Sequence, residues 1–265
     1  MSLPPFPSAA RKATRSLRLL MWDYPRYLSP LRLPLPEHRF AIFGRGRSGS
    51  TLLVNLMGSV EGIHCDNEIL HRAVPLPHLH VDVCASRCSQ PVYGFKLLSY
   101  QLKRVQPLSN REQFLRELSD RGYRLIYLTR RNLLYHALSN LHSRQRRQFH
   151  HSAERGRFEY RRWHVDVEAV LDWIAGSERL AAYEQRLLQD IPHLALTYEA
   201  DLQNAACHQH TVDRICDFLD LPSTPASATL VKLMPTRLED MLENHEELKA
   251  ALRSSPYERY VSAVG

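Results

Sequence analysis

The sequence has no long hydrophobic run and few cysteines. No apolar stretch approaches the roughly 18 residues of a membrane-spanning helix, so we expect no transmembrane segment. The five cysteines are an odd number, scattered in a 265-residue chain that is long enough to bury a core without disulfides. These absences argue against a membrane-embedded protein or a disulfide scaffold, and they predict reduced thiols in a cytoplasmic location.

Acidic side chains are missing from residues 1–22, where arginine, serine and proline are frequent. We expect residues 1–36 to form a basic N-terminal arm, partly disordered or packed on the surface. Residues 37–265 are then expected to fold as a single domain. A targeting segment is the alternative interpretation of the first residues, because transit peptides have the same composition.

The charge balance predicts an anionic partner. The chain carries 35 Lys and Arg against 28 Asp and Glu, for a formal net charge of +7. Such a charge attracts nucleotides, acidic glycans, nucleic acids or anionic membrane surfaces, and does not choose among them.

Strands alternate with helices along the chain. Short apolar runs at 40–43, 92–98, 124–129 and 193–199 predict strands, and those at 92–98 and 124–129 are expected to be buried. Apolar residues at helical spacing predict intervening helices at about 50–57, 109–120 and from 133, and the second half is mostly helical. This order predicts an α/β fold, a P-loop-like parallel sheet with helices on both faces and ligands at the carboxyl ends of the strands.

A glycine-rich loop, FGRGRSGSTLL, follows the first strand. Its glycines have the spacing of a phosphate-binding P-loop, but Ser50 stands where a nucleoside triphosphatase has its lysine. The expected strands also lack the terminal aspartate that helps to hold Mg²⁺. Backbone amides of Ser48 and Gly49 and the hydroxyl groups of Ser50 and Thr51 remain as ligands for a phosphate at the start of a helix.

Two motifs together resemble a known family. RSGSTLL, which begins at Arg47, is similar to the 5′-phosphosulfate loop of sulfotransferases that use 3′-phosphoadenosine 5′-phosphosulfate (PAPS), especially the bacterial carbohydrate and nodulation-factor type. RNLLYHALS places Arg131 and Ser139 as in the 3′-phosphate motif of that family, directly after a predicted strand. More diffuse similarity extends over roughly 39–260.

The resemblance implies a sulfotransferase fold, PAPS as the sulfuryl donor and no bound metal. Arg47 would stabilise the negative charge that develops on the bridging oxygen, where many relatives have lysine, and the loop residues 48–51 would bind the 5′-phosphate. Arg131 and Ser139 would hold the 3′-phosphate. Because Arg130 is adjacent, it could exchange roles with Arg131.

The acceptor hydroxyl needs a base, and we expect it to be Glu68. The chain descends the helix after the loop and returns through residues 62–65, so Glu68 should reach the cofactor edge of the sheet. In the carbohydrate relatives a glutamate after this return resembles the catalytic base. His64 and Asp66 remain alternatives. Lys96 would either touch the sulfate or acceptor, or extend its amine to solvent.

Other polar stretches are less specific. The basic segment 142–164 suggests a mobile lid, a nucleic-acid patch or a solvated loop. In the stretch 78–88, alternating His, Asp and Cys would share one face if the chain were extended, but no known metal motif is present and we expect no metal site. Glu199 is expected to be structural or close to adenosine.

Three classes of function therefore compete. A PAPS-dependent sulfotransferase acting on a carbohydrate or glycolipid hydroxyl explains both motifs and the charge. A degenerate P-loop kinase explains only the loop, and a non-enzymatic binder of nucleic acid or a membrane surface explains only the charge. We expect the sulfotransferase, with no nucleic-acid partner and with peripheral membrane contact as an open option.

Overall fold

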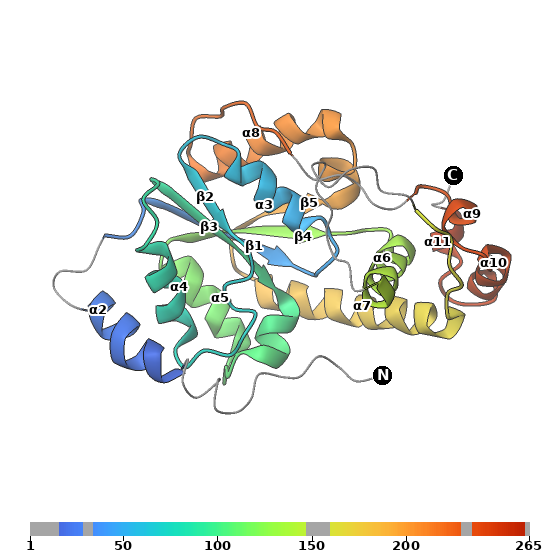
Figure 1. The fold of residues 1–265 in the computed structure, drawn as a ribbon, viewed down its shortest axis with the longest axis horizontal. Coiled ribbons are helices and arrows are strands. Elements are labelled where there is room, and N and C mark those ends of the chain that lie inside the picture. The colour runs from blue at the N-terminus through green and yellow to red at the C-terminus, as the bar shows by residue number, and fades with distance from the viewer. Residues whose placement is uncertain (1–15, 29–33, 147–159, 229–234, 263–265) are drawn as a thin grey trace.

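A five-stranded parallel sheet forms the centre of the molecule (Figure 1). The computed structural model describes residues 16–28, 34–146, 160–228 and 235–262. The strand order is β2-β3-β1-β4-β5. The strands are β1 (His38–Gly44), β2 (Ile63–Asp66), β3 (Val92–Leu98), β4 (Tyr123–Thr129) and β5 (His193–Thr197).

Helices connect the strands and cover both faces of the sheet (Figure 1). The α-helices are α2 (Tyr24–Leu28), α3 (Ser50–Gly58), α4 (Pro77–Ala85), α5 (Arg111–Asp120), α6 (Leu133–Arg146), α7 (Val167–Leu188), α8 (His208–Leu219), α9 (Leu238–Met241), α10 (His245–Arg253) and α11 (Arg259–Ser262). Short π- or 3₁₀-helical turns are η1 (Leu19–Asp23), η2 (Gln101–Val105), η4 (Tyr198–Leu202) and η5 (Ala205–Cys207).

The expected α/β class with helices on both faces is confirmed. Strands β1, β3 and β4 are almost wholly buried, which explains why their sequences read as continuous apolar runs rather than as alternating ones. Helices α4, α5 and α7 pack on one face of the sheet, and α3 and α8 pack on the other. A third cluster joins α6 and α7 to α9 and α10.

The parallel arrangement brings the carboxyl ends of the strands to one edge. In the pairing register, Gly44 at the end of β1 lies opposite Leu98 of β3 and Leu128 of β4. The glycine-rich loop therefore starts at the centre of the sheet, with the segments after β2 and β3 on one side and those after β4 and β5 on the other.

Two local features differ from the sequence reading. The stretch 78–88 is mostly the helix α4, so its His, Asp and Cys side chains do not share the face that an extended chain would give them. Its Asp82 is buried and accepts a hydrogen bond from the Tyr123 hydroxyl (3.1 Å). The return segment 62–65 contributes to a fifth strand, β2, which pairs with β3.

Residues 16–28 of the N-terminal arm are helical. Leu19 of η1 and Tyr24 of α2 are buried in the cluster that contains α4. The Tyr24 hydroxyl donates a hydrogen bond to the Leu76 carbonyl (3.5 Å), and Asp23 pairs with Arg87. Residues 16–28 thus pack against the domain, whereas residues 1–15 lie outside the described ranges.

The tight pairing of β1 with β3 gives a test of the core. A Cβ atom added to Gly94 would lie 2.1 Å from Cζ of the fully buried Phe40, its register partner. Gly94→Ala is therefore expected to lower the free energy of unfolding by about 1–3 kcal/mol through overpacking, measured by urea denaturation.

Gly58 at the end of α3 provides the matched control, because a Cβ there would meet no atom within 4 Å. Gly58→Ala should leave stability unchanged or raise it by about 0.5–1 kcal/mol. Equal effects of the two alanine substitutions would contradict the packing argument.

Candidate functional site

The glycine-rich loop turns from β1 directly into α3. Gly49, which precedes the first residue of α3, has a φ of 87°, in the left-handed region that favours glycine. A Cβ at this position would also lie 2.7 Å from Cδ2 of Tyr198 in η4. The loop therefore needs glycine for both backbone conformation and packing, and it places Ser50 and Thr51 at the positive end of α3.

Two side chains from the β4–α6 segment hold the carbonyl groups of the loop. The Nε2 of His136 donates a hydrogen bond to the Gly46 carbonyl (2.6 Å), and Nη1 of Arg130 donates to the Arg47 carbonyl (3.2 Å). Burial and the nearby charge of Arg45 lower the pKa of His136 to about 3. His136 is therefore a neutral, fixed donor near neutral pH.

Arg47 has a left-handed backbone, with a φ of 67°, although it is not glycine. Such a conformation typically costs about 1–3 kcal/mol and is frequent at functional sites. Its Nε donates a hydrogen bond to Oγ of Ser139 (3.1 Å). Burial and the adjacent Arg130 lower the pKa of Arg47 to about 10, so it remains a cation near neutral pH. Two close guanidinium groups favour an anion at this position.

Arg45 ties the loop to α7 through a buried ion pair. Its Nε lies 3.2 Å from Oε2 of Glu184, and its Nη1 donates a hydrogen bond to the Ser177 carbonyl (3.0 Å). The Tyr127 hydroxyl also donates to Oε2 of Glu184 (3.0 Å). Burial raises the pKa of Glu184, and the nearby Arg45 opposes this shift. Arg45 is thus held by a buried ion pair, and it also lines a cavity beside α7.

Glu68 lies beside the loop and is connected to it by Lys96. The Nζ of Lys96 is 3.1 Å from Oε1 of Glu68 and donates a hydrogen bond to Oγ1 of Thr51 (3.1 Å). Oε2 of Glu68 accepts hydrogen bonds from Nε2 of Gln101 (2.8 Å) and from the Tyr100 hydroxyl (3.1 Å). Lys96 is only 4% exposed, so its amine does not extend to solvent.

The two alternative bases form a separate contact. Nε2 of His64 lies 3.1 Å from Oδ1 of Asp66, and the Tyr93 hydroxyl donates a hydrogen bond to Oδ2 of Asp66 (3.0 Å). His64 and Asp66 are more exposed than Glu68. Of these three residues, Glu68 is the one that pairs with Lys96, which also bonds Thr51 of α3.

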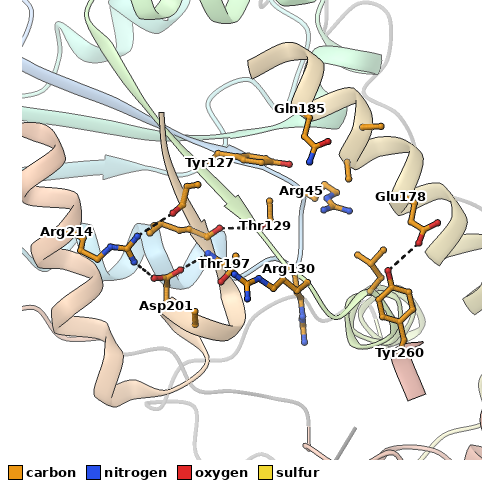
Figure 2. Close-up of a pocket in the computed structure, with 17 residues that line it drawn as sticks. Arg45, Tyr127, Thr129, Arg130, Glu178, Gln185, Thr197, Asp201, Arg214 and Tyr260 are labelled. Carbon is orange, nitrogen blue, oxygen red and sulfur yellow. Dashed lines mark hydrogen bonds and ion pairs between the residues drawn. The ribbon is translucent and has the colours of Figure 1, made fainter. Parts of the chain in front are cut away.

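Arg131 and Ser139 have different surroundings in the structure. Ser139 contacts Arg47, whereas Arg131 lines a cavity of about 720 Å³ between α7 and the ends of β4 and β5. Arg130 also lines this cavity, where Figure 2 shows it together with Thr129 and Thr197. Arg130 therefore connects the cavity with the loop.

Glu199 caps the start of α6. Its Oε2 accepts a hydrogen bond from the backbone nitrogen of Arg131 (3.0 Å), and its Oε1 accepts one from that of Asn132 (3.0 Å). Oε1 also lies 4.0 Å from Nε of Arg130. Its position agrees with the structural role expected from the sequence.

Several site residues were not identified in the sequence. Tyr198, whose ring centre lies 4.5 Å from the Arg130 guanidinium carbon, follows β5 in η4 but was read as part of the predicted strand 193–199. His136 lies between Arg131 and Ser139 in their motif. This position was the only feature of the sequence that could have pointed to a role for His136. Arg45 precedes the RSGSTLL motif in an irregular loop, and no pattern in the sequence indicated its ion pair with Glu184.

Two further sequence hypotheses concern a metal site and a lid. Among the described residues, no group of three or more His, Cys, Asp or Glu side chains could hold a metal ion. Residues 147–159, most of the basic segment proposed as a lid, lie outside the described ranges.

The comparisons with known proteins support the fold. No protein-family model matches the chain, and no curated protein matches its sequence. The structure is similar to the crystal structure of a sulfotransferase from Alicyclobacillus acidocaldarius, with a TM-score of 0.50 and 11% sequence identity. The alignment covers 86% of this chain and 94% of that chain. At this identity the similarity shows a common fold, and not a common substrate.

The buried His136 predicts how stability depends on pH. Its folded pKa of about 3 lies below its ordinary value of 6.5. The contribution of the neutral His136 to the free energy of unfolding is complete above pH 6.5. It decreases as the pH falls towards 3, because in this range only the unfolded chain takes up the proton. The expected loss is about 2 kcal/mol at about pH 5.

This prediction can be checked by urea denaturation near pH 7.5 and pH 5. His136→Gln should be less stable at neutral pH but should lack this part of the pH dependence. His210→Gln, at an exposed position of α8, is the matched control and should behave like the wild type. If His136→Gln and the wild type lost equal stability on acidification, the assignment of His136 as a neutral, buried imidazole would be wrong.

Proposed function

We propose that this protein is a sulfotransferase that transfers a sulfuryl group from PAPS to an acceptor hydroxyl, on a carbohydrate or glycolipid. The observation that carries the proposal is the bridge made by Lys96 between Thr51 at the start of α3 and Glu68. It brings a carboxylate next to an anion-binding loop that has no P-loop lysine. The shared fold with a known sulfotransferase supports the same activity.

The loop fits the phosphosulfate end of PAPS by its donor set. The N-terminus of α3, the hydroxyls of Ser50 and Thr51, and the Arg47 guanidinium all favour an anion. Ser48 is fully buried, and its Oγ has no hydrogen-bond partner within the described structure. We assign the amides of Ser48 and Gly49 and these hydroxyls to the 5′-phosphate.

We assign the 3′-phosphate to Arg131 and Ser139, with Arg130 beside them. Arg130 and Arg131 both line the cavity of about 720 Å³, a size typical of nucleotide-sized ligand sites. Nε of Arg130 is buried and donates to no hydrogen-bond acceptor in the described structure. A second phosphate near these arginines would supply a hydrogen-bond acceptor for that Nε–H group.

The chain supplies the remaining chemistry at two positions. When bound, PAPS offers a sulfuryl group on a phosphate leaving group. Glu68 accepts the proton of the acceptor hydroxyl, whose oxygen forms the new bond to sulfur while the bond from sulfur to the phosphate oxygen breaks. Arg47 stabilises the charge left on that oxygen by its own charge and hydrogen bonds, because arginine does not give up a proton.

The contacts of Glu68 suit the role of a base. An ionised carboxylate has about four acceptor positions. Lys96, Tyr100 and Gln101 occupy three and fix the orientation of the group. One acceptor position remains for the substrate hydroxyl. Tyr100 is 41% exposed next to this carboxylate, and its ring offers an apolar face on which the C–H face of a sugar could rest.

Substitution of the proposed base tests the chemistry. Glu68→Gln keeps the size of the side chain but removes its basicity, so kcat should fall by about 10²–10⁴-fold. The assay is transfer of labelled sulfate from PAPS to a panel of glycan, lipid and phenol acceptors. Glu61→Gln, at an exposed position before β2, is the matched control and should retain full activity. Full turnover by Glu68→Gln would refute the assignment of the base.

Nucleotide binding tests the donor independently of turnover. At about 100 times its dissociation constant, 3′,5′-adenosine bisphosphate should raise the melting temperature by about 5 °C or more. AMP should stabilise less, because it lacks the 3′-phosphate. Arg131→Ala should remove most of the difference between the two nucleotides, whereas Arg104→Ala, at an exposed position of η2, should preserve it.

The same experiment separates the competing functions. A larger shift with ATP and Mg²⁺ than with the bisphosphate would indicate a kinase-like protein. No shift with any of these nucleotides would contradict the proposed donor.

A further inference from the structure

Exposed large hydrophobic side chains are concentrated in one region of the described structure. Six of the seven belong to the N-terminal segment or to the residue it contacts. We call this set the N-terminal apolar patch: Leu17, Leu20, Met21, Trp22, Leu28 and Leu76, which are between 48% and 71% exposed. A patch of this kind on an otherwise polar surface usually marks an interaction site.

The segment is attached to the domain in a way that leaves the patch outward. Leu19 and Tyr24 are buried against the core, and Tyr24 bonds the carbonyl of Leu76. In Figure 1, α2 lies beside α4 at one end of the molecule. The buried side of the segment thus anchors it, while Trp22, at 71% exposure, is presented to the surroundings.

The charges in the N-terminal sequence are almost all positive. Residues 1–28 contain five Lys and Arg and a single acid, Asp23. Asp23 pairs with Arg87, so its negative charge is offset. The described exposed side chains from 17 to 28 are five large apolar residues, one proline and Arg18. The surface is therefore apolar and basic together.

We propose that the N-terminal apolar patch binds the surface of an anionic lipid bilayer. Basic helical segments with Trp and Leu on an exposed face lie in the headgroup region, where the apolar side chains leave water and the arginines meet anionic lipids. No helix in the described ranges has the length and apolarity to cross a membrane, which is consistent with attachment at the surface.

Two other occupants fit the charges or the apolar residues less well. A second copy of the chain would bring two basic segments face to face, because a symmetric dimer pairs a patch with itself. A nucleic acid would match the charge, but it offers no apolar phase for Leu20, Met21 and Leu28. A bilayer with anionic headgroups satisfies both features. This inference does not depend on the proposed sulfotransferase activity.

Vesicle binding by the full chain tests the proposal. We expect co-sedimentation with vesicles of phosphatidylcholine and phosphatidylserine, and weak binding to phosphatidylcholine alone. Binding should shift tryptophan emission to shorter wavelength, and the shift should be largely lost in Trp22→Phe, which keeps Trp163 and Trp173. The double variant Leu20→Ser, Trp22→Ser should bind the vesicles at least about tenfold more weakly.

A matched pair of charge reversals tests the role of position. Arg18→Glu should weaken vesicle binding about tenfold or more, since each basic residue near an anionic surface contributes about a fivefold factor. Arg179→Glu changes the net charge equally at an exposed position of α7 and should have a much smaller effect. Circular dichroism and the melting temperature verify that each variant is folded.

Several results would overturn the proposal. They are the absence of vesicle binding, equal losses in Arg18→Glu and Arg179→Glu, or unchanged binding of the serine variant. Concentration-dependent dimerisation that is abolished by the serine variant, without vesicle binding, would identify a second copy as the occupant instead.

Discussion

The site depends on the capture of two loop carbonyl groups by side chains of the neighbouring β4–α6 segment. His136 and Arg130 bond the carbonyls of Gly46 and Arg47, so these oxygens are occupied inside the protein. In a trans peptide unit the C=O and N–H bonds point in opposite directions. When the carbonyl groups are fixed inside the protein, the amide groups at the start of α3 are therefore left for an anion. The conformation of the loop is thus determined by residues that are remote from it in sequence.

This arrangement is unfavourable in the absence of an anion. It holds Arg47 in a left-handed conformation, buries Arg130 and keeps the His136 imidazole neutral. One hydrophobic cluster on each face of the sheet stabilises the fold and offsets the free-energy cost of such a site. Local strain that the surrounding fold maintains is typical of binding and catalytic loops. The proposed donor would relieve part of it by placing negative charge between the guanidinium groups.

The sequence predicted the parts of the fold that have local signals. The strands β1, β3 and β4 were identifiable as apolar runs, and the turn at Gly49 by its composition. Helix α4 was not evident from the polar alternation in 78–88. The contact of Glu68 with Lys96 could not be derived, because it joins the segment after β2 to β3. The structure also shows which of two adjacent arginines bonds the loop, which sequence spacing leaves open.

The strand order has a consequence for how such a site can diversify. The loop at the centre of the sheet separates two flanks, with Glu68 and Tyr100 after β2 and β3, and Arg130 and Glu199 after β4 and β5. Under the proposed function, the first flank faces the acceptor and the second flank binds the donor. Mutations on the first flank can then change the acceptor preference while the nucleotide-binding flank stays intact. A new acceptor specificity can therefore evolve without an inactive intermediate.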